Sequence, residues 1–272
     1  IQLGSNDLSG WDFSGQNLTS ARLVGSTLTN AKFTGAVVAR ADFTDATSRG
    51  FTKEQLYSTG SYRRKELQGV RLESNDLKSW DFSGQNLNSA DMHSTMLNSA
   101  NLAGANLTGT VFSNSTLSNA NVAGANLSGA FLYQTTLTDA NLARARLVSS
   151  TLTNSNFSGA NLTSTDLSYS TLTKVNLSGA AVTGAQFTDT TSRGFTKEQL
   201  YSTASYQQRN LQGVGLSGDD LTGWDLGYQN LTAARLSDST LTGVNLAGAV
   251  VTRAYFNRTT SHGFTQEQLY ST

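Results

Sequence analysis

Large apolar residues recur at every fifth position of this 272-residue chain, and this period constrains the fold more than any other feature. Leu, Phe, Val or Met occupies every fifth position from Leu3 to Phe43, from Leu67 to Phe187 and from Leu211 to Phe256, forty-four positions in all. A period of five fits neither the 3.6-residue period of an amphipathic helix nor the two-residue alternation of a half-buried strand. A short fixed period predicts a solenoid, in which each repeat packs against its neighbours.

The residues around each central apolar residue follow a second rule. The residue two before it is usually Ala, Ser or Thr, the residue just before it is often Asn or Asp, and polar or Gly residues usually follow, as in 100–104, ANLAG. This pattern resembles the pentapeptide-repeat family. The resemblance implies an all-β solenoid, a right-handed quadrilateral β-helix with one pentapeptide per face and about 20 residues per coil, here with short helical insertions.

Breaks in the period divide the chain. We expect β-helix coils over 1–45, 65–189 and 209–258, helical insertions over 46–64 and 190–208, and a truncated third insertion over 259–272. We expect these parts to form one continuous solenoid. Because the third insertion stops where the earlier copies continue, the chain resembles a fragment of a longer tandem array of the kind found in large bacterial proteins.

Each insertion carries the signals of a short helix. Thr52 and Gln55 form a capping box, and Phe51 and Leu56 have the spacing of a hydrophobic staple, so we expect helices after Thr52, Thr196 and Thr265. Trp replaces the small residue at a fixed distance after each complete insertion, and we expect it to pack against that insertion. The predicted structural junction comprises Trp11, Trp80, Trp224, Phe51, Leu56, Phe195 and Leu200. The alternative is that these aromatic residues recognise a partner.

Thr-Leu-Thr triplets mark successive coils, and one step between them is irregular. The step from Leu137 to Leu152 is fifteen residues, which predicts either an irregular coil or a shift of the motif by one face. The outward Thr residues resemble the Thr-x-Thr ladders of ice-binding β-solenoids. A possible surface-binding set is therefore Thr136, Thr138, Thr151, Thr153, Thr171 and Thr173. The alternative is that Thr simply suits extended backbone.

The composition argues against catalysis and metal binding. The chain has no Cys, and its two histidines, His93 and His262, have no acidic or histidine partner at ligand spacing, so we expect no metal site. Ser is abundant without a nucleophile elbow, and no carboxylate pair stands out as catalytic. We therefore expect no enzyme, no catalytic residues and no cofactor.

Charge and hydropathy restrict the partners. With 19 basic and 19 acidic residues the chain has no net field to attract nucleic acid, and no run of eighteen apolar residues could span a membrane. Some pentapeptide-repeat proteins mimic DNA and bind type II topoisomerases, but those relatives are acidic. The favoured hypothesis is a non-enzymatic scaffold rod that binds an unknown protein partner or associates with itself through its solenoid ends. The Ser, Thr and Asn content without Cys favours an extracytoplasmic location.

Overall fold

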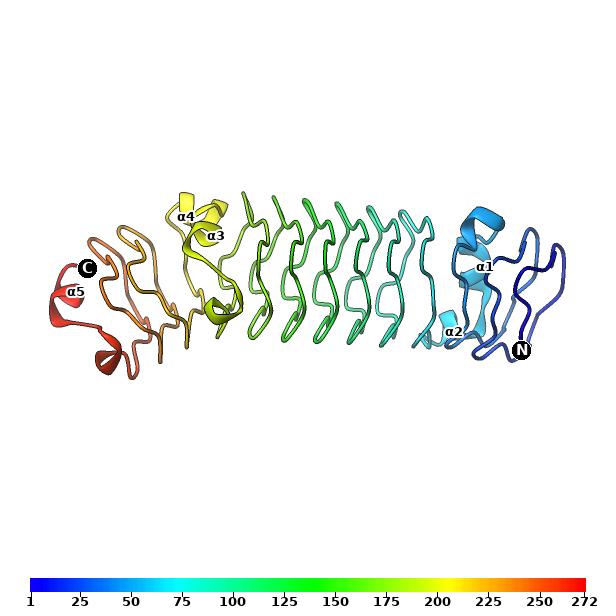
Figure 1. The fold of residues 1–272 in the computed structure, drawn as a ribbon, viewed down its shortest axis with the longest axis horizontal. Coiled ribbons are helices and arrows are strands. Elements are labelled where there is room, and N and C mark those ends of the chain that lie inside the picture. Colours follow the sequence, from blue (N-terminus) through cyan, green and yellow to red (C-terminus); the bar gives the residue numbers. More distant parts are fainter.

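The computed structural model describes residues 1–272 as an elongated rod of stacked coils, with the two termini at opposite ends (Figure 1). Isolated parallel β-bridges join residues 20 apart, for example Asn101 to Asn121 and Asn121 to Asn141. Each coil therefore contains four pentapeptides. Only one residue of each pentapeptide is bridged, so the expected strands are reduced to single bridged residues that form ladders along the rod.

A tight turn after each central residue explains why only one residue of each pentapeptide is bridged. In the pentapeptide of Leu102 the Ala105 N–H donates to the Leu102 carbonyl at 3.1 Å, and Gly104 between them has φ +63°. A positive φ favours Gly, and Asn114 (φ +61°) shows that Asn also adopts it. The chain turns again before a second ladder residue can form.

The inward side chains form one continuous core. Nearly all central Leu, Phe, Val and Met residues, and most Ala residues two positions before them, belong to a single cluster of 69 buried residues that runs along the rod. Ala100 and Ala120, for example, are both buried. Small partners leave room inside the coil for one large side chain per pentapeptide.

Asn before the central residue forms a second ladder, on the outside. Asn121 Nδ2 donates to Asn101 Oδ1 at 3.2 Å, and Asn141 Nδ2 donates to Asn121 Oδ1 at 3.3 Å. The same Oδ1 atoms accept N–H groups two residues ahead, as Ala103 N to Asn101 Oδ1 at 3.2 Å shows. One amide thus closes its own turn and links two coils.

The only helices lie in the insertions, and the capping box marks where the main ones begin. Thr52, Thr196 and Thr265 cap three helices as predicted, whereas the short helices capped by Thr59 and Thr203 were not predicted. The helical elements are η1 (Thr47–Arg49), α1 (Lys53–Ser58), α2 (Gly60–Arg63), η2 (Thr191–Arg193), α3 (Lys197–Tyr201), α4 (Ala204–Gln207), η3 (Thr260–His262) and α5 (Gln266–Tyr270). No helix has the length and apolar character needed to cross a membrane.

The ladders continue across both complete insertions. Asp42 bridges to Arg71 and Gln186 bridges to Gly215, and each pair is 29 residues apart instead of 20. Within the first insertion, Arg49 O accepts from Leu28 N and Ser58 O accepts from Gly35 N, so the insertion supplies partners for two faces. Each insertion is therefore a widened half-coil within the stack.

The fifteen-residue step leaves the ladder regular. Thr116 bridges to Thr136 and Thr136 to Asn156, while Phe131 bridges to Thr151 and Thr151 to Thr171. The motif therefore shifts by one face, and the alternative of an irregular coil is wrong. The second insertion also starts from a different face than the first. The first insertion ends before Arg71, and the ladder that continues from Arg71 does not include Gln186, the residue bridged across the second insertion.

Candidate functional site at the helical junctions

Aromatic side chains fill the space between each insertion and the coil that follows it. Junction one is insertion 46–64 with the coil that contains Trp80, and junction two is insertion 190–208 with the coil that contains Trp224. At junction one Phe51 stacks on Phe43 at 4.5 Å and lies 6.2 Å from Trp80 between ring centroids. Leu56 is fully buried beside them.

Junction two repeats this packing. Phe195 stacks on Phe187 at 4.5 Å and lies 5.8 Å from Trp224, and Leu200 is fully buried. Trp80 and Trp224 each retain only 6% exposure. The structure thus brings six of the seven predicted junction residues together in two groups of three.

Gln accompanies Trp at both junctions for a related reason. Gln85 Nε2 donates to the Tyr62 carbonyl at 3.0 Å, and Gln229 Nε2 donates to the Tyr206 carbonyl at 3.0 Å. Each carbonyl lies in the last turn of a short helix, α2 or α4, and also accepts a backbone N–H, from Lys65 or Arg209. Trp and Gln, which each take the place of a small residue two positions before a central Leu or Phe, therefore both contact the insertion directly.

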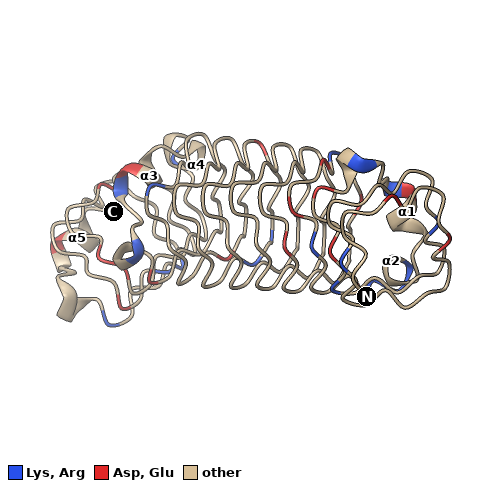
Figure 2. Ribbon diagram, turned by 45° about the vertical axis from the view of Figure 1, so that its right-hand side comes forward, with Lys and Arg blue, Asp and Glu red and all other residues tan.

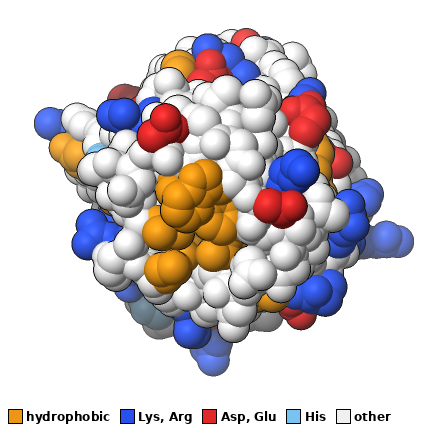
Figure 3. Space-filling view, turned by 90° about the vertical axis from the view of Figure 1, so that its right-hand side faces the viewer, with side chains coloured by type: hydrophobic (Ala, Val, Ile, Leu, Met, Phe, Trp, Pro, Cys, Tyr) orange, Lys and Arg blue, Asp and Glu red, His pale blue; other side chains and the backbone are white.

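Trp11 lies apart from the two junctions, on the first coil. Its side chain is 51% exposed and its only aromatic neighbour is Phe13, at 5.9 Å. The end of the rod that carries the N-terminus shows an apolar patch surrounded by polar and charged residues (Figure 3). Trp11 occupies the repeat position of Trp80, but no insertion covers it.

Two tyrosines at each junction replace a missing ladder partner. The Asp81 N–H donates to Tyr57 Oη at 2.5 Å, and Tyr62 Oη donates to the Asp81 carbonyl at 2.8 Å. Tyr201 and Tyr206 hold Asp225 in the same way. Because a helix cannot offer the next coil an extended backbone edge, the phenol groups satisfy these backbone atoms. Sequence analysis missed all four tyrosines, although Tyr recurs at fixed positions in both insertions.

Burial favours the neutral form of these phenols. Desolvation is the main cause that raises the pKa of Tyr57, Tyr62 and Tyr201, and it raises the pKa of Tyr206 to about 12. The two rings of each pair stack at 4.4 Å. The hydroxyl groups are therefore hydrogen-bonding groups at neutral pH and not acids.

A buried amide at junction one is replaced by a buried acid at junction two. Asn75 accepts the Thr47 N–H and donates to the carbonyls of Phe43 and Leu72 at 2.8 and 2.9 Å. Asp219 accepts from Thr190 and Thr191 through Oδ1, whereas its buried Oδ2 has no partner. Desolvation raises the pKa of Asp219 to about 7. A carboxylate at this place lacks the donor that the Asn amide supplies.

Junction two also has a groove of about 570 Å³. Lys197, Glu198, Asp220, Thr222, Trp224 and Thr240 are among its lining residues. At the corresponding positions of junction one, Lys78 and Met96 replace Thr222 and Thr240. No matching groove is found at the first junction, where these longer side chains stand.

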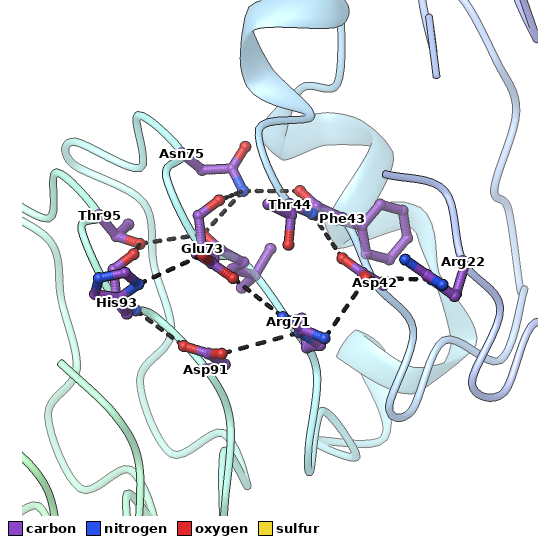
Figure 4. Close-up of polar contacts among 11 residues, drawn as sticks. Arg22, Asp42, Phe43, Thr44, Arg71, Glu73, Asn75, Asp91, His93 and Thr95 are labelled. Carbon is purple, nitrogen blue, oxygen red and sulfur yellow. Dashed lines mark hydrogen bonds and ion pairs between the residues drawn. The ribbon is translucent and has the colours of Figure 1, made fainter. Parts of the chain in front are cut away.

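A charged ladder runs from the first coils past junction one (Figure 4). Arg22, Asp42, Arg71 and Asp91 alternate in sign on successive coils and bridge one another through the backbone. Glu73 and His93 lie beside it, with Glu73 Oε1 3.4 Å from His93 Nδ1. The expectation that His93 has no acidic partner is wrong, because residues 20 apart in sequence stack on adjacent coils. The other histidine, His262, contacts Ser261 and the Arg258 carbonyl instead.

The predicted Thr surface is divided between two faces. Thr136 bridges to Thr116 on one side and to Asn156 on the other, whereas Thr151 and Thr171 stack below Phe131. Thr138 and Thr153 are half-buried and Thr173 is exposed. Each ladder thus stacks two Thr residues, with Asn156 on the coil after one pair and Phe131 on the coil before the other.

The repeat chemistry identifies the family. The family model for pentapeptide repeats matches residues 2–35, 66–102, 76–114, 97–132, 115–154, 155–191 and 220–258. These ranges cover most of the chain, which belongs to the pentapeptide-repeat family. The unmatched residues are mainly the two insertions and the third insertion at the end.

Solved structures of other pentapeptide-repeat proteins are similar. HetL from the cyanobacterium Nostoc sp. strain PCC 7120, described as involved in heterocyst differentiation regulation, is 20% identical over 94% of this chain and 88% of its own, with a TM-score of 0.29. Rfr23 from the cyanobacterium Cyanothece 51142 is 26% identical over 45% and 92%, with a TM-score of 0.34. QnrB1, a plasmid-mediated fluoroquinolone resistance protein, is 18% identical over 80% and 90%, with a TM-score of 0.37. No curated protein sequence matches the chain.

Proposed function

We infer that this chain is a non-enzymatic scaffold rod, a right-handed quadrilateral solenoid whose two complete insertions widen the stack without dividing it into domains. The single observation that supports this role is the core of 69 buried residues, which continues through both junctions. Residues of both signs are scattered along the rod, with several near the insertions (Figure 2). A mixed surface of this kind suits protein contacts better than the single-signed field that nucleic acid requires.

The interaction that the geometry favours is end-to-end association of two copies. Within the rod, an insertion always covers the Trp of the next coil, and its tyrosines bond the backbone of the next coil. At one end of this chain Trp11 is 51% exposed, and at the other end Tyr270 of α5 is 73% exposed. The two ends therefore carry the two halves of a junction.

The contact is heterologous, because different surfaces of the two copies meet, and a heterologous contact on a rod extends into open filaments. We expect concentration-dependent oligomers without a fixed upper size.

Light scattering coupled to size-exclusion chromatography of the 272-residue chain tests this assembly. We expect the mean mass to rise with protein concentration, and Trp11→Ser or Tyr270→Ser to lower it. Tyr133→Ser is the matched control, since Tyr133 is 40% exposed on the side of the rod and not at an end. A constant monomer mass, or equal effects of all three variants, would contradict end-to-end association while leaving the scaffold role intact.

The scaffold role has its own test. Small-angle X-ray scattering of the Trp11→Ser variant should give the cross-section and length of one unbent rod. Scattering from a chain that bends at 46–64 or 190–208 would rule out a rigid spacer.

A further inference from the structure

Two adjacent coils near junction one break the rule for the residue that follows each central apolar residue. Among the forty-four such positions, Glu73 is the only acidic residue and His93 is the only histidine. The corresponding positions after junction two are Ser217 and Ser237, which follow the rule. The repeat pattern therefore explains neither side chain, and the two lie one coil apart on the same face.

Their geometry is that of a set of metal ligands. One ligand atom each from Glu73, Asp91 and His93 lies within 4.8 Å of the others, and all three residues are half-buried. Two atoms bound tetrahedrally to one zinc ion at about 2.1 Å lie about 3.4 Å apart. The observed distance from Glu73 Oε1 to His93 Nδ1 is 3.4 Å.

The surrounding charges leave room for a cation. Arg71 Nη2 bonds the other oxygen of Glu73, Oε2, at 3.1 Å, so Oε1 remains directed at His93. Arg71 also lies 3.8 Å from Asp42 Oδ2 and 3.9 Å from Asp91 Oδ2, so its single positive charge is shared among three carboxylates. The group of Arg22, Asp42, Arg71, Glu73 and Asp91 has three carboxylates and two guanidinium groups. One negative charge is left beside the His93 imidazole.

We propose that Glu73, Asp91 and His93 bind one zinc ion, with water completing the coordination. One imidazole nitrogen and two carboxylate oxygens suit a borderline divalent ion such as zinc. The ion would link the coil of Leu72 to the coil of Met92, immediately after the widened half-coil of junction one. Its role there is to fasten two coils together.

Titration of zinc chloride into the full chain, followed by calorimetry, tests the site. We expect one ion per chain, and at least tenfold weaker binding in His93→Ser and in Glu73→Ser. Both substitutions introduce the residue that the repeat itself uses at Ser237 and Ser217, so the coils should still form, which circular dichroism checks. His262→Ser is the control, because this second histidine lies at the other end of the rod.

A cobalt(II) titration gives an independent readout. Coordination by His93 should produce visible absorption bands that His93→Ser removes and His262→Ser retains. Absence of zinc binding by the unsubstituted chain, or unchanged affinity in His93→Ser, would overturn the proposal. In either case the three side chains form only an ion-pair network.

Discussion

Junction one and junction two solve the same structural problem with the same buried aromatic residues, yet they differ at the polar positions around them. Phe51, Leu56 and Trp80 correspond to Phe195, Leu200 and Trp224, and the ring distances nearly coincide. In contrast, Asn75 becomes Asp219, and Lys78 becomes Thr222. The comparison indicates that the widened half-coil needs the buried Phe, Leu and Trp side chains. The polar positions around them can differ, and these differences change the charge and the groove at each junction.

Removal of the junction Trp should have the largest effect and should affect both junctions equally. Trp80→Ala and Trp224→Ala each leave a cavity under the insertion, which costs about 3 to 5 kcal/mol. Because coils contact only their neighbours, the loss should be local. Hydrogen exchange should accelerate in 46–64 for the first variant and in 190–208 for the second. Trp11→Ala is the control and should change neither segment, since Trp11 is half exposed.

The buried Asp should make junction two, and not junction one, sensitive to pH. The folded-state pKa of Asp219 is raised to about 7 from 3.8, so the folded state favours the protonated acid. This contribution to stability is complete below about pH 4 and is lost as pH rises to about 7. The negative charge of Asp189, on the preceding coil, adds to this rise in the pKa of Asp219.

Exchange of the two residues should exchange the pH dependence. Asp219→Asn should stabilise junction two at pH 8 by a few kcal/mol and leave it nearly unchanged at pH 4. Asn75→Asp should destabilise junction one at pH 8 but not at pH 4. Hydrogen exchange of 190–208 and 46–64 at the two pH values measures both effects. Equal protection of 190–208 at pH 4 and pH 8 in the unsubstituted chain would refute this explanation.

The sequence predicted the architecture because each rule acts within one pentapeptide or one helix turn. The five-residue period and the Thr52 capping box each depend on neighbours close in the chain, and Trp80 stands out because it breaks the rule for a small residue within its own pentapeptide. The contacts that the sequence did not predict join different coils. Tyr57 reaches Asp81 across 24 residues, and Glu73 reaches His93 across 20. Pairs of this kind can be found in the sequence only by aligning it in rows of twenty residues, one row per coil, with nine extra residues allowed for each insertion.

Loss of one tyrosine hydroxyl should have an intermediate effect that is again equal at the two junctions. Tyr62→Phe and Tyr206→Phe each leave a backbone carbonyl, of Asp81 or Asp225, without its donor, at a cost of about 1 to 2 kcal/mol. The raised pKa of Tyr206, about 12, means that the neutral phenol stabilises the fold below pH 10 and that this contribution is lost as pH rises through about 12. Alkaline unfolding followed by circular dichroism should therefore begin above pH 10, and its first phase should be smaller in a Tyr62→Phe, Tyr206→Phe double variant.

The capping box should have the smallest effect, and it tests whether the insertions depend on local or on tertiary stabilisation. Thr52→Ala and Thr196→Ala each remove the hydroxyl that accepts Gln55 N–H or Gln199 N–H, which costs about 1 kcal/mol. The Gln side chains should hold the helices in place, because Gln55 Nε2 also donates to the Leu28 and Ala31 carbonyls at 2.8 Å. Thr52→Ser keeps the cap and is the control. If hydrogen exchange shows that Thr52→Ala unfolds 46–64 as fully as Trp80→Ala does, the helix depends on its cap, and the aromatic filling is not the main source of junction stability.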